Sequence, residues 1–296
     1  MKSRFAHRLA LAAVWSTLLL VTFGGYTRGS GSGYGCKDRW PLCEDGLLGG
    51  YLPRLEPEML VEWTHRWIAL LVGILAVVLV VVAYRARLDR RWVLFPSIAA
   101  VIAIGIQAWL GRMVVKGDLA RDLVTIHLFV SMVVVALFVI VAVSTRDAAH
   151  GPNLLERDWS RQLGVGAVAV FVVILLGSAV HGVYVPGWPL VNGELVPDLS
   201  ASNALMVHWL HRMFSAAVFI YLIFLVWRGA NVKRPHSEAW FVIGATAFYV
   251  INAGIGLLQV LTEVESSWVI ALHLGVAGLV WAALVAATFL SFQDPR

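Results

Sequence analysis

The chain has 296 residues, of which 59% are hydrophobic and only 14% are charged. This balance is typical of membrane proteins and excludes an ordinary pair of soluble domains, which would need a polar surface. The formal net charge of +5 comes mostly from basic loops between apolar runs, so it gives no reason to predict nucleic-acid binding.

Eight apolar runs are long enough to span a bilayer, which requires about 20 residues per helix. We therefore predict an all-α, polytopic membrane protein embedded in a lipid bilayer. The predicted spans are 9–25, 61–84, 93–115, 121–143, 163–182, 204–227, 239–261 and 268–291.

The first run follows a basic start, as a cleaved signal peptide would. No small-residue cleavage site stands out after Leu20, and the glycine-rich segment Thr27–Gly33 follows directly. We therefore expect this helix to be retained as an anchor.

Lysine and arginine are concentrated in alternate loops, at 85–91, 146–161 and 228–234, and at the N-terminus. Short cytoplasmic loops carry such an excess of positive charge. We predict a multi-pass protein of the cell membrane with both termini in the cytoplasm.

The longest predicted non-membrane stretch, from Tyr26 to Leu60, contains both cysteines, Cys36 and Cys43. On the extracytoplasmic side two such cysteines can close a small loop, as a structural clip or as a redox pair. The motifs Cys-x-x-Cys and Cys-x-x-Cys-His are absent, which argues against thioredoxin-like chemistry and covalently attached haem.

Charged groups inside the predicted membrane spans form a duplicated pattern. His65 is followed after 62 residues by His127, and His211 is followed after the same 62 residues by His273. An ionisable side chain in a membrane segment costs at least ~2.5 kcal/mol and usually marks a functional site.

This spacing predicts two tandem four-helix bundles related by a parallel internal repeat. The N-terminal half would span 1–145 and the C-terminal half 163–296, with a cytoplasmic linker at 146–162. Because each half has an even number of helices, the repeat is parallel, which argues against inverted-repeat transporters.

All four histidines are predicted near the extracytoplasmic ends of their helices. Two imidazoles on neighbouring helices can act as axial ligands of a haem iron. A zinc or copper site or hydrogen bonds between helices are the alternatives, but the equal spacings favour two separate haem sites.

Other polar residues accompany this pattern. Arg66 and Arg212 follow two of the histidines and could pair with haem propionates or extend towards lipid headgroups. Glu62 and His208 occupy equivalent positions in the two halves. Because only the first half has a carboxylate there, we predict that the first half carries out the chemistry and that the second half transfers electrons. The remaining histidines are predicted beside the ligands (His181) or solvated (His7, His150 and His236).

Taken together, Thr27–Gly33, the Trp-Pro-Leu-Cys of the cysteine loop, Glu-x-x-His-Arg at 62–66 and the later histidines resemble the haem A synthase family of eight-helix membrane proteins. The resemblance implies oxidation of a porphyrin methyl group of haem O to a formyl, by successive hydroxylations, to supply haem A to cytochrome oxidases. A haem O synthase and an unidentified electron acceptor are the partners it suggests.

The resemblance also implies roles for individual residues. The substrate haem would bind at His65 and His127, and Glu62 would assist its oxidation. A b-type haem held by His211 and His273 would relay electrons, and Cys36–Cys43 would be a disulfide. Two other functions compete with this one: a dihaem b-type electron-transfer cytochrome, and a haem transporter or chaperone.

Overall fold

The structure is a computed structural model that describes residues 2–146, 149–150, 157–198, 200, 202–231 and 237–294. Eight of its helices are long and apolar enough to cross a membrane, so the predicted all-α architecture is confirmed. These helices are α1 (Lys2–Gly29), α2 (Pro57–Arg85), α3 (Phe95–Lys116), α4 (Arg121–Ser144), α5 (Arg157–Ala179), α6 (Asn203–Asn231), α7 (Ser237–Leu261) and α8 (Ser267–Leu290).

Short elements complete the described part of the chain. Two 3-10 turns, η1 (Ser32–Tyr34) and η2 (Leu48–Gly50), lie between α1 and α2, and a π-helical turn, η3 (Arg90–Leu94), leads into α3. The strands β1 (Ala149–His150) and β2 (Gln293–Asp294) form a two-residue antiparallel ladder. Apart from residues 149–150, the predicted linker is described only at its two ends, and His236 lies outside the described residues.

The helices pack as two closed groups of four. In the first, α1 contacts α2 and α4, and α3 contacts α2 and α4; in the second, α5 contacts α6 and α8, and α7 contacts α6 and α8. The two groups meet along a seam where α1 contacts α8 and α4 contacts α5 and α8. An internal sequence repeat stays a prediction.

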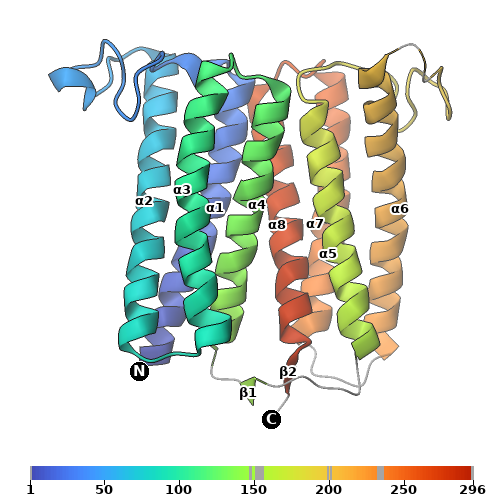
Figure 1. Cartoon of the computed structure of the whole chain (residues 1–296). Helices are drawn as coiled ribbons and strands as arrows, with labels where there is room; N and C mark the ends of the chain where they lie inside the picture. Colours follow the sequence, from blue (N-terminus) through green and yellow to red (C-terminus); the bar gives the residue numbers. More distant parts are fainter. Residues whose placement is uncertain are drawn as a thin grey trace.

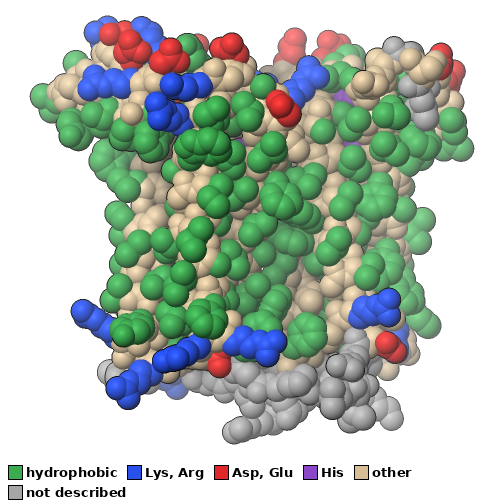
Figure 2. Space-filling view, viewed as in Figure 1, with side chains coloured by type: hydrophobic (Ala, Val, Ile, Leu, Met, Phe, Trp, Pro, Cys, Tyr) green, Lys and Arg blue, Asp and Glu red, His purple; other side chains and the backbone are tan. Residues whose placement is uncertain are grey.

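The helices run upright, with α1 beginning and α8 ending at the same end of the molecule (Figure 1). We call this the termini end, and we call the opposite end, which carries residues 30–56 and 180–198, the loop end. Apolar side chains cover the flanks between the ends, and basic side chains lie at both ends, together with most of the acidic ones at the loop end (Figure 2). Which end faces the cytoplasm stays a prediction.

The loop before α2 is closed by a disulfide between Cys36 and Cys43, as the family resemblance implied. Both cysteines are buried in a small cluster with Met59 and the ring of Trp63. This cluster holds the loop on the first turns of α2.

His7 was predicted to be solvated, and that prediction is wrong. Its Nδ1 lies 2.8 Å from the carbonyl oxygen of Ala142, so the half-buried ring joins α1 to α4. The side chain of His150 lies outside the described residues.

Candidate functional site

A cavity of about 1330 Å³ lies in the part of the bundle nearest the loop end and is lined by both groups of four helices. It exceeds the roughly 300–1,000 Å³ of an ordinary small-molecule pocket. Glu62 and all four predicted ligand histidines line it. The seam between the two groups therefore contains room for a large ligand or for two.

The histidines come together in the predicted pairs. His65 lies close enough to His127, and His211 close enough to His273, for their charges to interact. We call His65 and His127 the first pair, and His211 and His273 the second pair.

The two pairs differ in how their rings are held. In the second pair, Nδ1 of His211 lies 3.1 Å from the Val173 carbonyl oxygen, and Nδ1 of His273 lies 3.1 Å from the Asn252 carbonyl oxygen. A carbonyl can only accept, so each Nδ1 carries the proton and each Nε2 keeps its lone pair. Metal-bound histidines are commonly fixed in this way.

In the first pair, Nδ1 of His65 and Nδ1 of His127 are both buried without a hydrogen-bond partner. His65 is instead stacked on Phe23, with ring centroids 6.4 Å apart. Among the described residues, no hydrogen bond fixes which nitrogen of either ring carries the proton.

Each of the four rings also lies against a glycine of a neighbouring helix. A Cβ added to that glycine would come within 2.9 to 3.4 Å of the histidine Cε1. The pairs are Gly24 with His65, Gly111 with His127, Gly177 with His211 and Gly256 with His273. The approach excludes a side chain at Gly177, is tight at Gly24 and Gly256, and at Gly111 is at the limit of an ordinary contact.

Glu62 is buried, and both of its oxygens are in use. Its Oε2 accepts a hydrogen bond of 2.7 Å from the Cys36 backbone N–H, and its Oε1 is ion-paired with Arg66 at 2.5 Å. Arg66 Nε donates to the same Oε1 at 3.1 Å, so the protein itself fills at least three of the roughly four acceptor positions of an ionised carboxylate. The disulfide loop thus orients the carboxylate directly.

The equivalent residue, His208, also ties its helix to a loop. Its Nε2 lies 2.9 Å from the Val183 carbonyl oxygen. The two halves therefore use the same position for a loop contact, but only the first provides a carboxylate there.

Arg66 and Arg212 bind the two outer loops. Arg66 donates to the carbonyl oxygens of Arg39, Pro41 and Leu42. Arg212 donates to carbonyl oxygens of the second loop, those of Val185, Gly187 and Leu190. Their predicted pairing with propionates stays untested, and the observed bonds give them a role in fixing loop conformation.

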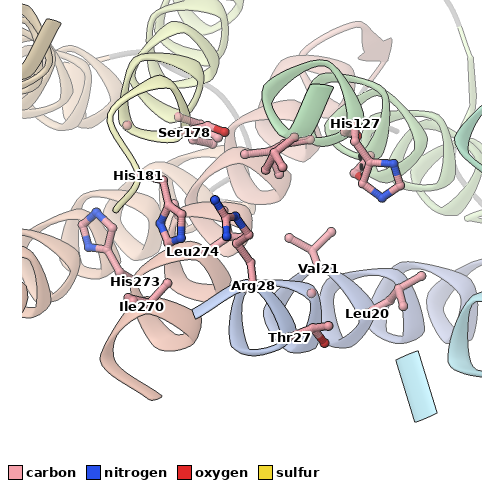
Figure 3. Close-up of a pocket in the computed structure, with 18 of the residues that line it drawn as sticks. Leu20, Val21, Thr27, Arg28, His127, Ser178, His181, Ile270, His273 and Leu274 are labelled. Atoms are coloured by element: carbon pink, nitrogen blue, oxygen red, sulfur yellow. Dashed lines mark hydrogen bonds between the residues drawn. The ribbon is translucent and has the colours of Figure 1, made fainter. Parts of the chain in front are cut away.

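His181 lies just past the end of α5 and lines the cavity. Burial and the nearby charges of Arg28 and Arg121 lower its pKa to about 4. Figure 3 shows Arg28 rising from α1 into the space between His127 on one side and His181 and His273 on the other.

Among the described residues, no three His, Cys, Asp or Glu side chains are close enough to hold a bare metal ion. The alternative of a zinc or copper site built from the four histidines and Glu62 therefore has no support in the geometry. Two facing histidines beside a large apolar cavity suit a planar iron macrocycle better, since its own nitrogens supply the other iron ligands.

The family profile described as cytochrome oxidase assembly protein, COX15-CtaA, matches residues 7–285 of the chain. The chain belongs to this family. The match includes α2 to α7 completely, most of α1 and α8, and every residue of the candidate site.

Several curated relatives of the chain are named heme A synthase. The one from Listeria monocytogenes is 26% identical over 267 residues, covering 85% of this chain and 86% of the relative. The one from Symbiobacterium thermophilum is 26% identical over 319 aligned residues, covering 100% and 98%. The one from Shouchella clausii is 27% identical over 269 residues, covering 86% of each.

Several residues that line this cavity were not identified from the sequence, namely Arg28, Gln107, Asn252 and the four glycines that lie against the histidine rings. Gln107 donates to the His127 carbonyl oxygen at 2.8 Å, and its Oε1 is buried without a partner, as is Oδ1 of Asn252. One signal was available: Gln107 precedes Gly111 by four residues, as Asn252 precedes Gly256.

Proposed function

We propose that this protein is a haem A synthase, which oxidises a porphyrin methyl group of haem O to the formyl group of haem A. Membership of the cytochrome oxidase assembly family and the names of the relatives support a role in haem A biosynthesis. The observation that carries the finer assignment is the difference between the two histidine pairs.

The second pair suits a permanent cofactor. His211 and His273 are each oriented by a backbone carbonyl, with Nε2 left to bind iron. A haem b bound there would supply one-electron transfer. The C-terminal half is thus the proposed electron relay to an acceptor outside the chain.

The first pair suits a substrate that must enter and leave. Among the described residues, no hydrogen bond orients the rings of His65 and His127 or raises their basicity, so they should hold iron less tightly than the second pair does. Glu62 lies in the same part of the cavity and is held by the Cys36 N–H and by Arg66. It would accept a proton or stabilise positive charge as the methyl group is oxidised.

The proposal includes the setting of the reaction. The protein would lie in the cell membrane with both termini cytoplasmic and its cavity on the extracytoplasmic side. Haem O, the product of a haem O synthase, would be received in the first half.

The test is to purify the protein from cells that make haem O and to analyse the extracted haems by chromatography and mass spectrometry. We expect haem B together with haem A or a hydroxylated precursor. Glu62→Gln should keep haem B but yield no oxidised product, since the amide can still accept the Cys36 N–H but carries no charge. His208→Gln is the matched control and should keep forming product.

Two outcomes would contradict the assignment. If the protein yields only haem B under every condition, it is an electron-transfer cytochrome rather than an enzyme. If Glu62→Gln is no more impaired than His208→Gln, the carboxylate is not catalytic.

A further inference from the structure

Three arginines line the cavity, namely Arg28, Arg66 and Arg212, and Glu62 is the one acidic residue among its described lining. Arg66 is paired with Glu62 and bound to loop carbonyls, and Arg212 is bound to three loop carbonyls. Both guanidiniums therefore already have hydrogen-bond partners within the protein.

Arg28 differs from the other two. Its Nε is buried and has no hydrogen-bond partner. Within the described part of the chain, neither a hydrogen bond nor an ion pair of its guanidinium is formed. Its neighbours Arg121, which is positively charged, and the partly buried His181 provide no negative charge.

Within the described lining, Arg28 is thus a half-buried cation, with a fully buried Nε, that has no counter-charge of its own. Burying such a group without a partner is costly. A guanidinium pairs best with a carboxylate or phosphate, to which it can donate two parallel hydrogen bonds. A ligand that brings a carboxylate or a phosphate into the cavity would therefore find a hydrogen-bond donor in Arg28.

The position of Arg28 indicates which part of a ligand it would meet. Arg28 follows Gly24 by four residues, so the two lie on one face of α1, one turn apart, and Gly24 contacts the His65 ring. From the other side, His181 lies beside it and His273 faces the same space (Figure 3). Arg28 is therefore within reach of the loop-end edge of a macrocycle bound at either histidine pair.

We propose that Arg28 binds a carboxylate of a haem in this cavity, with His181 beside it as a second nitrogen partner. This inference rests on the proposed function for the presence of haem. It assigns the propionate contact to Arg28 rather than to the arginines that follow His65 and His211. The carboxylate can come from the haem of the first or of the second pair.

The experiment measures transfer of haem from the purified, haem-loaded protein to excess apomyoglobin. Arg28→Met removes the charge and leaves no buried polar group. We expect it to release one of the two haems at least about tenfold faster than wild type, as for loss of a charge-assisted hydrogen bond. Arg28→Lys keeps the charge without the paired geometry, so its release rate should lie between the two.

Arg54→Met is the matched control, because Arg54 is an exposed arginine at the same end that does not line the cavity. Its release rates should equal those of wild type. Extraction of the transferred haem identifies the source: haem B indicates the second pair, and haem O or its oxidised products indicate the first.

A second readout is the midpoint potential of the haem that remains bound. Loss of a nearby cation favours the oxidised form of the haem iron. Arg28→Met should therefore lower the midpoint potential of the affected haem. Wild-type release rates and potentials in Arg28→Met would overturn the inference and leave the proposed function intact. A wild-type protein that binds no haem would instead overturn the proposed function.

Discussion

The contact between each histidine and a glycine limits where the imidazole ring can lie. A methyl group on Gly177 would lie 2.9 Å from Cε1 of His211, which is closer than side chains normally approach. The ring would have to turn away, and the bond between Nδ1 and the Val173 carbonyl oxygen would be strained with it.

We therefore expect Gly177→Ala to weaken binding of the second haem and to cost about 1–3 kcal/mol of stability, the usual range for overpacking. Gly244→Ala is the control, since an added Cβ there meets no atom within 4 Å and Gly244 does not line the cavity. The absorption spectrum of reduced haem b, measured per mole of protein, checks the prediction. Equal haem b content in the two variants would contradict it.

The second histidine pair should be required for the b-type spectrum. His211→Ala or His273→Ala removes one axial ligand and leaves the opposite ring without a partner across the iron. We expect the spectrum of reduced haem b to be lost in both variants, while helix content by circular dichroism stays unchanged. Full haem b content in either variant would refute the pairing.

His181 predicts a pH dependence of stability. Because its pKa is lowered to about 4 in the folded protein, the unfolded chain binds a proton below about pH 6.5 while the native chain does not. Stability is therefore lost as pH falls from about 6.5 towards 4. The test uses protein made in a haem-deficient host. Between pH 7 and pH 5, His181→Gln should lose less thermal stability than wild type. An equal loss in the two proteins would show that His181 does not contribute to the pH dependence.

At the scale of elements, the loop closed by the disulfide helps to position the carboxylate of Glu62. Cys36 contributes both the disulfide sulfur and the backbone N–H that Glu62 accepts. Opening the loop should loosen this donor without touching either histidine pair.

Cys36→Ser combined with Cys43→Ser should therefore lower conversion of haem O several-fold while leaving haem b content unchanged. The stability cost should be about 2 kcal/mol or less, since the closed loop is short. Product formation and thermal denaturation, measured side by side, check this. A variant that loses haem b as well would show that the loop supports the whole bundle rather than the carboxylate.

Hydropathy predicted the helices well, but it predicted their ends less well. The first span was predicted as 9–25, whereas α1 runs from Lys2 to Gly29. Hydropathy falls where charged residues begin, but backbone hydrogen bonding continues through them to the bilayer surface. At α5 the helix begins at Arg157 and ends at Ala179, so His181 lies in the following turn rather than inside the span.

The candidate site was predictable where its residues repeat. His65, His127, His211 and His273 stand out because charge in an apolar run is rare and the spacing is duplicated. Gly177 and Arg28 gave no comparable signal. A glycine in a membrane helix is common, and the use of an arginine near a helix end depends on which carbonyls and carboxylates the fold brings to it.

At the scale of the whole molecule, α4 and α8 form the centre of the bundle. The most hydrophobic stretch of each is 50% buried, compared with 17–39% for the other six. Trp281 on α8 donates to the Met132 carbonyl oxygen on α4 at 3.0 Å, so this bond crosses between the two groups of helices.

Trp281→Phe should remove that hydrogen bond while keeping an aromatic ring against Phe171. We expect a loss of about 1 kcal/mol in stability with both haem contents unchanged, because the bond lies outside the cavity lining. Thermal denaturation in detergent measures the stability, and pigment extraction measures the haem contents. A loss of haem would mean that the seam controls the site from a distance.

The cavity occupies only the part of the bundle next to the loop end, and the part next to the termini end is closed by tightly packed apolar side chains such as Leu79, Phe138, Leu222 and Leu284. If the protein takes a hydrophobic substrate from the bilayer, as proposed, the cavity therefore offers space for it at the depth of one leaflet alone. Any membrane enzyme that delivers the substrate must present it in that same leaflet, so the direction of handover would be fixed by how the two proteins are inserted.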